Sequence, residues 1–95
     1  MKNLILTKSP LMKDCFDFLW KEEIRGTLAK FDKEINIQII ESRKPNEGNC
    51  QRFIKEFKKD LESKKLKLVS STSLSKSWTH ICKKFDIKIY DKPRI

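Results

Sequence analysis

Hydrophobic positions in the first third of the chain predict one strand and one long helix. Residues 2–7 centre on the aliphatic triplet Leu4-Ile5-Leu6, which is typical of a short strand. Ser9 and Pro10 follow, and a serine directly before a proline indicates a helix start with the serine as N-cap. Apolar residues then recur at three- and four-residue spacing, the period of one helix face, and predict a helix over residues 11–31. These residues are Leu11, Met12, Cys15, Phe16, Leu19, Trp20, Ile24, Leu28 and Phe31.

The middle of the chain changes from the period of a strand to that of a helix. Residues 34–41 place Ile35, Ile37 and Ile39 on one side and polar side chains on the other, which predicts a strand with one wetter face. A turn over residues 45–48, which contains a proline and a glycine, leads into a second helix. Its apolar stripe is Cys50, Phe53, Ile54, Phe57 and Leu61. The outer face of this helix is mostly basic.

The same alternation continues to the end of the chain. Residues 65–70 and 86–90 predict two short strands, and the segment between them has the apolar stripe of a third helix. That stripe consists of Leu74, Trp78, Ile81, Cys82 and Phe85. The predicted order is therefore strand, helix, strand, helix, strand, helix, strand.

This order predicts a small single α/β domain with a mostly parallel four-stranded sheet. Helices of this length usually connect neighbouring strands as right-handed crossovers, which makes those strands parallel. The second, third and fourth predicted strands alternate polar with apolar residues, whereas a sheet covered on both faces is almost continuously apolar. The pattern leaves two architectures open, an open-faced two-layer sandwich and a small three-layer one.

Length and composition restrict the class of protein. A chain of 95 residues is expected to form one domain, residues 1–95, without a linker or targeting segment. Hydrophobic residues make up 38% and charged residues 37%, and the longest aliphatic run is too short to cross a membrane. Three widely spaced cysteines predict buried, reduced thiols rather than a disulfide framework. We therefore expect a soluble cytoplasmic protein with no membrane partner.

Charge is the strongest functional signal in the sequence. The chain holds 22 Lys and Arg against 13 Asp and Glu, a net charge of +9. Residues 1–47 carry 9 basic and 8 acidic side chains, whereas residues 48–95 carry 13 and 5, so a net +8 belongs to the second half. Basic domains attract polyanions by long-range attraction and counterion release. We expect a small non-enzymatic protein that binds DNA or RNA; the alternative is that the lysines only maintain solubility.

Three predicted loops have the composition of a phosphate-binding site. If the strands are parallel, the loops after the first three strands lie at one edge of the sheet, where ligands of α/β proteins usually bind. Each loop combines hydroxyl or amide side chains with a Lys or Arg, as a phosphate requires. The expected contacts are Lys8, Ser9, Arg43, Lys44, Ser71, Thr72, Ser73 and Lys76 from the loops, with Lys55 and Lys59 from the second helix. Such residues are also the usual caps and turn formers, so a purely structural role is the alternative.

Candidate chemistry elsewhere in the chain is sparse. The polar sides of the predicted strands offer a second surface for single-stranded nucleic acid, which consists of Asn36, Gln38, Lys65, Lys67, Lys88 and Tyr90. Stacking surfaces usually present two or three aromatics and this one has a single tyrosine, so a solvated edge strand whose lysines prevent aggregation is the favoured alternative. His80 is the only histidine and has no carboxylate at helical spacing, which indicates a surface residue rather than a catalytic base. Asp32 followed by Glu41-Ser42-Arg43 is similar to a carboxylate-strand nuclease signature, but the lysine is displaced by one position. No residue set predicts a metal, a cofactor or an enzymatic activity.

A protein-interaction module, an inhibitor or accessory subunit that docks on an acidic partner, is the alternative function. Phe18 and Trp20 lie at the margin of the predicted helix stripe, and an exposed aromatic there would anchor an interface or a dimer. The segment 77–84 (SWTHICKK) resembles the last helix of BRCT domains, in which a Trp and a small residue four positions later face the core. The glycine pair typical of that family is replaced here by Phe31-Asp32-Lys33.

Overall fold

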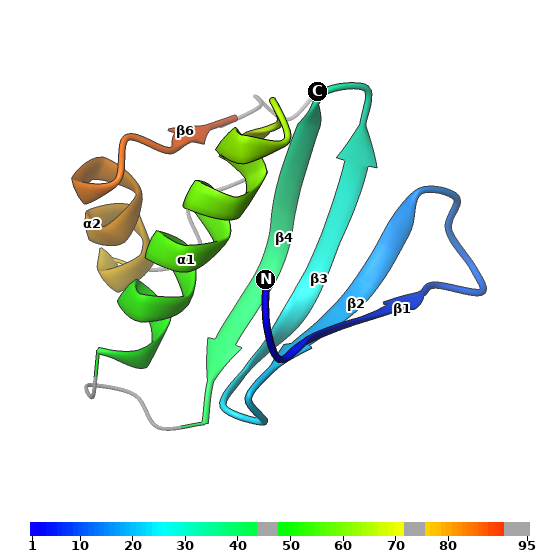
Figure 1. Ribbon diagram of the computed structural model, residues 1–95, viewed down its shortest axis with the longest axis horizontal. Coiled ribbons are helices and arrows are strands. Elements are labelled where there is room, and N and C mark those ends of the chain that lie inside the picture. The colour runs from blue at the N-terminus through cyan, green and yellow to red at the C-terminus, as the bar shows by residue number, and fades with distance from the viewer. Residues whose placement is uncertain (44–47, 72–75, 91–95) are drawn as a thin grey trace.

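The computed structural model describes residues 1–43, 48–71 and 76–90, which form one six-stranded sheet and two helices (Figure 1). In chain order the elements are β1 (Leu4–Lys8), β2 (Cys15–Trp20), β3 (Ile24–Phe31), β4 (Glu34–Ser42), α1 (Asn49–Ser63), β5 (Lys67–Ser70), α2 (Lys76–Lys84) and β6 (Lys88–Ile89). The strands follow one another across the sheet in the order of the sequence.

The sheet is mixed and mostly antiparallel. β1 to β4 form an antiparallel meander, and β5 and β6 then add parallel to β4. α1 and α2 are the two crossovers that these parallel neighbours require. The prediction of a mostly parallel four-stranded sheet is therefore wrong, because hairpins join the first four strands and a hairpin allows only antiparallel pairing.

Residues 11–31 form a loop and the β2–β3 hairpin instead of the predicted helix. β2 buries Phe18 and Trp20 on one face, at alternate positions, as a strand does. The turn that follows has positive φ angles at Lys21 and Glu22, 52° and 57°. Two successive positive φ angles belong to the type I′ turn, whose twist matches that of a two-stranded hairpin. The chain therefore reverses where the apolar spacing predicted that a helix continues.

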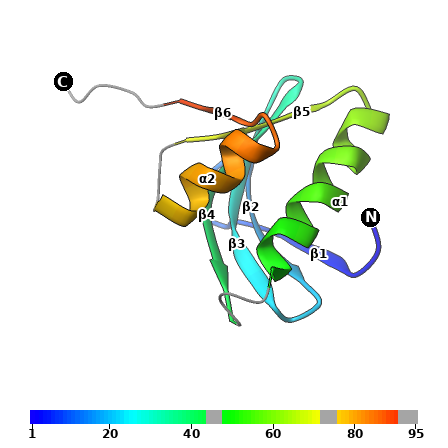
Figure 2. The same ribbon diagram turned by 90° about the vertical axis from the view of Figure 1, so that its left-hand side faces the viewer.

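Both helices cover the same face of the sheet, so the protein has two layers and one open sheet face (Figure 2). A single hydrophobic core lies between the layers. The predicted helix stripes are confirmed where they are described: the core contains Phe53, Ile54, Phe57 and Leu61 of α1 and Trp78, Ile81 and Cys82 of α2. The partly buried Cys50 and Phe85 pack against it, and Leu74 lies outside the described residues. Neither helix in the described ranges is long and apolar enough to cross a membrane.

Aromatic rings fix the position of α1 on the sheet. Phe53 is fully buried, and its ring stacks on Phe18 of β2 at a centroid distance of 5.4 Å. Phe57 stacks on the ring of Phe53 at a centroid distance of 5.2 Å, and Trp20 lies tilted against the ring of Phe53 at 5.5 Å. Such pairs add about 0.5–1.5 kcal/mol each to the apolar area that they bury. The β2–β3 hairpin and α1 therefore share one aromatic cluster.

A β-bulge at Gln38 changes which face of β4 is buried. The register between β3 and β4 shifts between Thr27 and Leu28, which leaves Gln38 as an extra residue. Beyond this residue the alternation is reversed, so that Ile39 is 54% exposed and Ile40 packs against the core. The predicted single face of isoleucines is therefore wrong at Ile39.

The two tryptophans allow a comparison of a satisfied and an unsatisfied buried N–H. Trp78 Nε1 donates to Ser70 Oγ at 2.9 Å, whereas the buried Trp20 Nε1 has no acceptor among the described residues. We expect Trp78→Phe to lower the free energy of unfolding by about 1–2 kcal/mol more than Trp20→Phe does, because only Trp78→Phe removes a hydrogen bond. Urea unfolding followed by circular dichroism measures both values. Equal losses would contradict this difference between the two sites.

Candidate functional site

The structure does not bring the three predicted phosphate loops together. β1 is antiparallel to β2, β2 to β3 and β3 to β4, so β1 and β4 run in opposite directions. Lys8 is the last residue of β1, and Ser9 follows it. They therefore lie at the end of the sheet where β4 begins, opposite to the end toward which β4 and β5 run. Ser9 Oγ accepts the N–H groups of Leu11 and Met12 at 3.3 and 3.4 Å, so this serine caps a turn and not a helix.

Arg43 and Ser71 lie at different positions along β4 and bind different partners. Arg43 closes the β2–β3 hairpin: its backbone N–H donates to the Glu23 carbonyl at 2.8 Å and its guanidinium to the Glu22 carbonyl at 3.3 Å. Ser71 follows the short strand β5 beside the middle of β4, where its Oγ donates to Asn36 Oδ1 at 2.9 Å. Three other predicted contacts, Lys44, Thr72 and Ser73, lie outside the described residues.

The predicted cations that do share a surface lie on the helices. Lys55 and Lys59 are exposed on the face of α1 opposite its buried stripe. Lys76 is exposed on the corresponding face of α2, and Lys83 joins it there two turns later. We call these four residues the helix-face lysines. Lys83 is not among the contacts predicted from the sequence, although its seven-residue spacing from Lys76 places both on one helix face.

Two hydrogen bonds hold α1 and α2 side by side. Lys84 Nζ at the end of α2 donates to Gln51 Oε1 in the first turn of α1 at 2.8 Å. Lys58 Nζ of α1 donates to the carbonyl of Phe85, directly after α2. The helix-face lysines therefore belong to one continuous helical layer, which is seen in front of the sheet in Figure 2.

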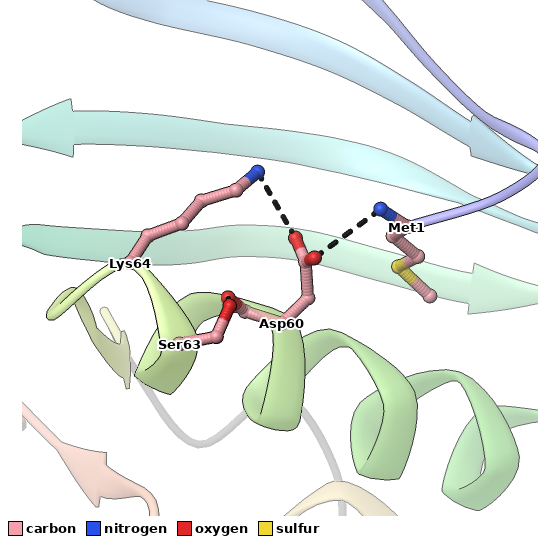
Figure 3. A network of polar contacts seen from close by, with 4 residues as sticks. All are labelled: Met1, Asp60, Ser63 and Lys64. Carbon is pink, nitrogen blue, oxygen red and sulfur yellow. Dashed lines mark hydrogen bonds and ion pairs between the residues drawn. The ribbon is translucent and has the colours of Figure 1, made fainter.

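The three ion pairs among the described residues involve cations other than the helix-face lysines. Asp60 binds the N-terminal ammonium of Met1 and the ammonium of Lys64, each at 3.2 Å (Figure 3). Burial acts to raise the pKa of Asp60, but the hydrogen bonds from Lys64 and Met1 lower it overall. A further ion pair joins Arg25 and Glu41 on the open sheet face. Within the described ranges, the helix-face lysines form no hydrogen bond or ion pair, so their charge is available to a ligand.

The surface of α2 also carries a hollow. It has a volume of about 280 Å³ and is lined by Lys76, Thr79, His80 and Lys83. The prediction that His80 lies at the surface is confirmed, because its side chain is exposed. Two ammonium groups, an imidazole and a hydroxyl are donors that suit a phosphate oxygen.

The open face of the sheet is a less favourable surface for a polyanion. Of the residues predicted for it, Tyr90 is engaged: its hydroxyl donates to the two carboxylate oxygens of Glu34 at 3.0 and 3.3 Å. This hydrogen bond, with smaller contributions from burial and from the Glu34 charge, raises the pKa of Tyr90. Asp17 adds negative charge on the same face, where Glu41 is paired with Arg25. The predicted stacking surface therefore has a carboxylate beside its single tyrosine.

The candidate catalytic residues do not converge. Asp32 lies in the β3–β4 turn and Glu41 near the other end of β4, so the nuclease-like pair is separated by most of a strand. Burial raises the pKa of Cys50 to about 11, and burial together with the nearby Cys50 raises that of Cys82 to about 11, so neither is a thiolate at neutral pH. Within the described ranges, no three His, Cys, Asp or Glu side chains are grouped to hold a metal ion.

The two aromatic residues expected to anchor an interaction module, Phe18 and Trp20, are buried. Phe18 is 2% exposed and Trp20 is 1% exposed, because both belong to the core beneath α1. The alternative function loses the sequence feature that supported it. Cys15 and Cys82 are buried and Cys50 is half-buried, as expected for reduced structural thiols.

Comparison with known proteins gives no relative. No protein family, no curated protein and no solved structure matches the chain. The resemblance of α2 to the last BRCT helix implied that Trp78 and Cys82 are buried, and they are. Because no family matches, the burial of these two residues shows only that α2 is an amphipathic helix.

Proposed function

We propose that this protein is a non-enzymatic nucleic-acid-binding protein that contacts backbone phosphates through the helix-face lysines. The observation that carries the proposal is the arrangement of Lys55, Lys59, Lys76 and Lys83 on one helical layer without carboxylate partners among the described residues. An ammonium that is not neutralised by its own chain displaces counterions from a phosphate at little cost.

The proposed contacts are sequence-independent. Lysine presents a flexible point charge to a phosphate oxygen, and it carries no bidentate geometry for reading a base. His80 lines the same hollow as Lys76 and Lys83 and adds one more donor beside these two ammonium groups. We therefore expect affinity for DNA and RNA to depend on charge density rather than on base sequence.

Salt dependence tests this proposal directly. Four neutralised phosphates predict that log K falls with log salt at a slope of about −2.8 to −3.6, or about 50- to 150-fold between 50 and 200 mM salt. Fluorescence anisotropy with labelled 20-nucleotide single- and double-stranded DNA and RNA measures that slope. A Kd above about 100 μM for every probe at low salt would contradict nucleic-acid binding, because non-specific binders are generally tighter.

A further inference from the structure

Among the described residues, β1 forms an edge of the sheet that is unpaired along its whole length. β1 is the first strand of the sheet and β6, with two residues, is the last. Apolar side chains stand exposed on both faces of β1, with Ile5 59% and Leu6 51% exposed, and the following loop exposes Leu11 at 92%. The β1–β2 hairpin projects away from both helices in Figure 1. Natural proteins normally cover or charge such an edge, because its free backbone groups pair with other strands.

The hydrogen bonds at the two ends of β1 show which backbone groups are free. The Asn3 carbonyl accepts the Lys21 N–H at 3.3 Å, and the Ser9 N–H donates to the Cys15 carbonyl at 2.9 Å. Bonded and non-bonded positions alternate along an antiparallel pair, so the odd-numbered residues of β1 face β2. The even-numbered residues Leu4, Leu6 and Lys8 therefore direct their N–H and C=O groups out of the sheet.

The outward-facing N–H and C=O groups of β1 can pair with the same groups of a second copy of β1. A two-fold axis perpendicular to the sheet beside Leu6 brings two β1 strands together antiparallel, with Leu6 opposite the partner's Leu6. Leu4 then lies opposite the partner's Lys8, and every paired residue has outward-facing donors and acceptors. The two leucines meet on the helix-facing side, where each is half-exposed in the single chain.

The charge distribution favours a second copy at this edge over an acidic partner. β1 belongs to residues 1–47, which carry 9 basic and 8 acidic side chains and so a net charge of only +1. The net +8 lies in residues 48–95, which form α1, β5, α2 and β6. Two copies that meet at β1 approach through their nearly neutral halves.

We propose that two copies of this chain pair through β1 and form a dimer with one continuous sheet. The perpendicular two-fold axis places the helices of both copies on the same side of that sheet. Because five-residue strands bury a small area, the dimer is expected to be weak and dependent on concentration.

Sedimentation velocity of the wild-type protein between about 1 μM and 1 mM tests the pairing. The expected result is a rise in mass from one chain to two. Leu6→Pro removes an outward N–H without breaking a bond to β2, and we expect it to weaken the dimer at least about 10-fold. Leu6→Lys, which keeps the backbone donor but charges the edge, is expected to act in the same direction and serves if the proline variant does not fold. Ile39→Thr is the matched control, because it removes an exposed apolar side chain from the open sheet face.

Three results would overturn the proposal. A wild-type protein that is monomeric at about 1 mM has no such pairing. A dimer that Ile39→Thr dissociates and that both Leu6 variants leave intact uses the open sheet face instead. Oligomers larger than two chains also exclude it, because a closed two-fold interface ends at the dimer.

Discussion

Gly26→Ala is expected to lower the free energy of unfolding by about 3 kcal/mol or more. Gly26 lies in β3, where a strand normally gains from alanine, because glycine loses more conformational freedom on folding. At this position, however, an added Cβ would lie 1.9 Å from the carbonyl oxygen of Ile39 and 2.9 Å from the ring of Phe18. The first of these atoms is backbone and cannot rotate away.

The clash has its cause in the bulge at Gln38. The extra residue brings the Ile39 carbonyl of β4 over β3, and glycine is the residue that leaves room for it. Guanidinium unfolding of Gly26→Ala measures the effect, with Thr27→Ala beside it as the control, for which we expect a loss below about 1 kcal/mol. A Gly26→Ala protein as stable as the wild type would show that β3 and β4 pair without this close approach.

The second half of the fold is predictable from the sequence because each element has a single clear period. Residues 34–41 alternate up to the bulge, residues 50–61 repeat at helical spacing, and a proline and a glycine at positions 45 and 48 separate the two patterns in the sequence. Observed β4, α1, β5, α2 and β6 accordingly lie where the pattern predicts them. In these segments, apart from Ile39 and Ile40 beyond the bulge at Gln38, the core-facing residues are apolar and most outer residues are polar or charged, so local pattern and tertiary packing agree.

The first half is not predictable in the same way because both faces of β2 carry apolar residues. Phe16 and Phe18 face the core, while Cys15 and Leu19 lie on the other face, so the alternation of a strand is masked. The reversal at residues 21–22 uses lysine and glutamate, whereas a type I′ turn is usually signalled by Asn-Gly or Asp-Gly. Spacings of three and four residues then arise by chance from two strands and a turn.

The error in the first half also explains the error in the site. A helix after β1 would have made β1 parallel to its neighbours and brought Lys8 to the loops after β4 and β5. The hairpins instead place Lys8 at the opposite end of the sheet, where β4 begins. Lys55, Lys59 and Lys76 remain together because they lie on elements that the pattern predicts correctly.

Removal of the four helix-face lysines is expected to produce the largest loss of nucleic-acid affinity. Replacing Lys55, Lys59, Lys76 and Lys83 with Gln should weaken binding at 50 mM salt at least about 100-fold, because about four phosphate contacts are lost together. The side chains are exposed and form no bond within the described ranges, so the free energy of unfolding should change by less than about 1 kcal/mol.

A second set of four lysines provides the matched control. Four exposed lysines lie at the end of the sheet where β1 and β3 end: Lys8, Lys13, Lys30 and Lys33. Either set of substitutions lowers the net charge by the same four units, from +9 to +5. Long-range attraction is therefore reduced similarly in both variants, and only the location of the lost charges differs.

The salt slope of these two variants, measured by fluorescence anisotropy with the same 20-nucleotide duplex DNA, tests the proposed interface most directly. The proposal predicts that the helix-face variant loses most of the slope of about −2.8 to −3.6 and that the control variant retains it. Equal slopes and equal affinities in the two variants would contradict it, because the charge would then act as a general field with no defined surface.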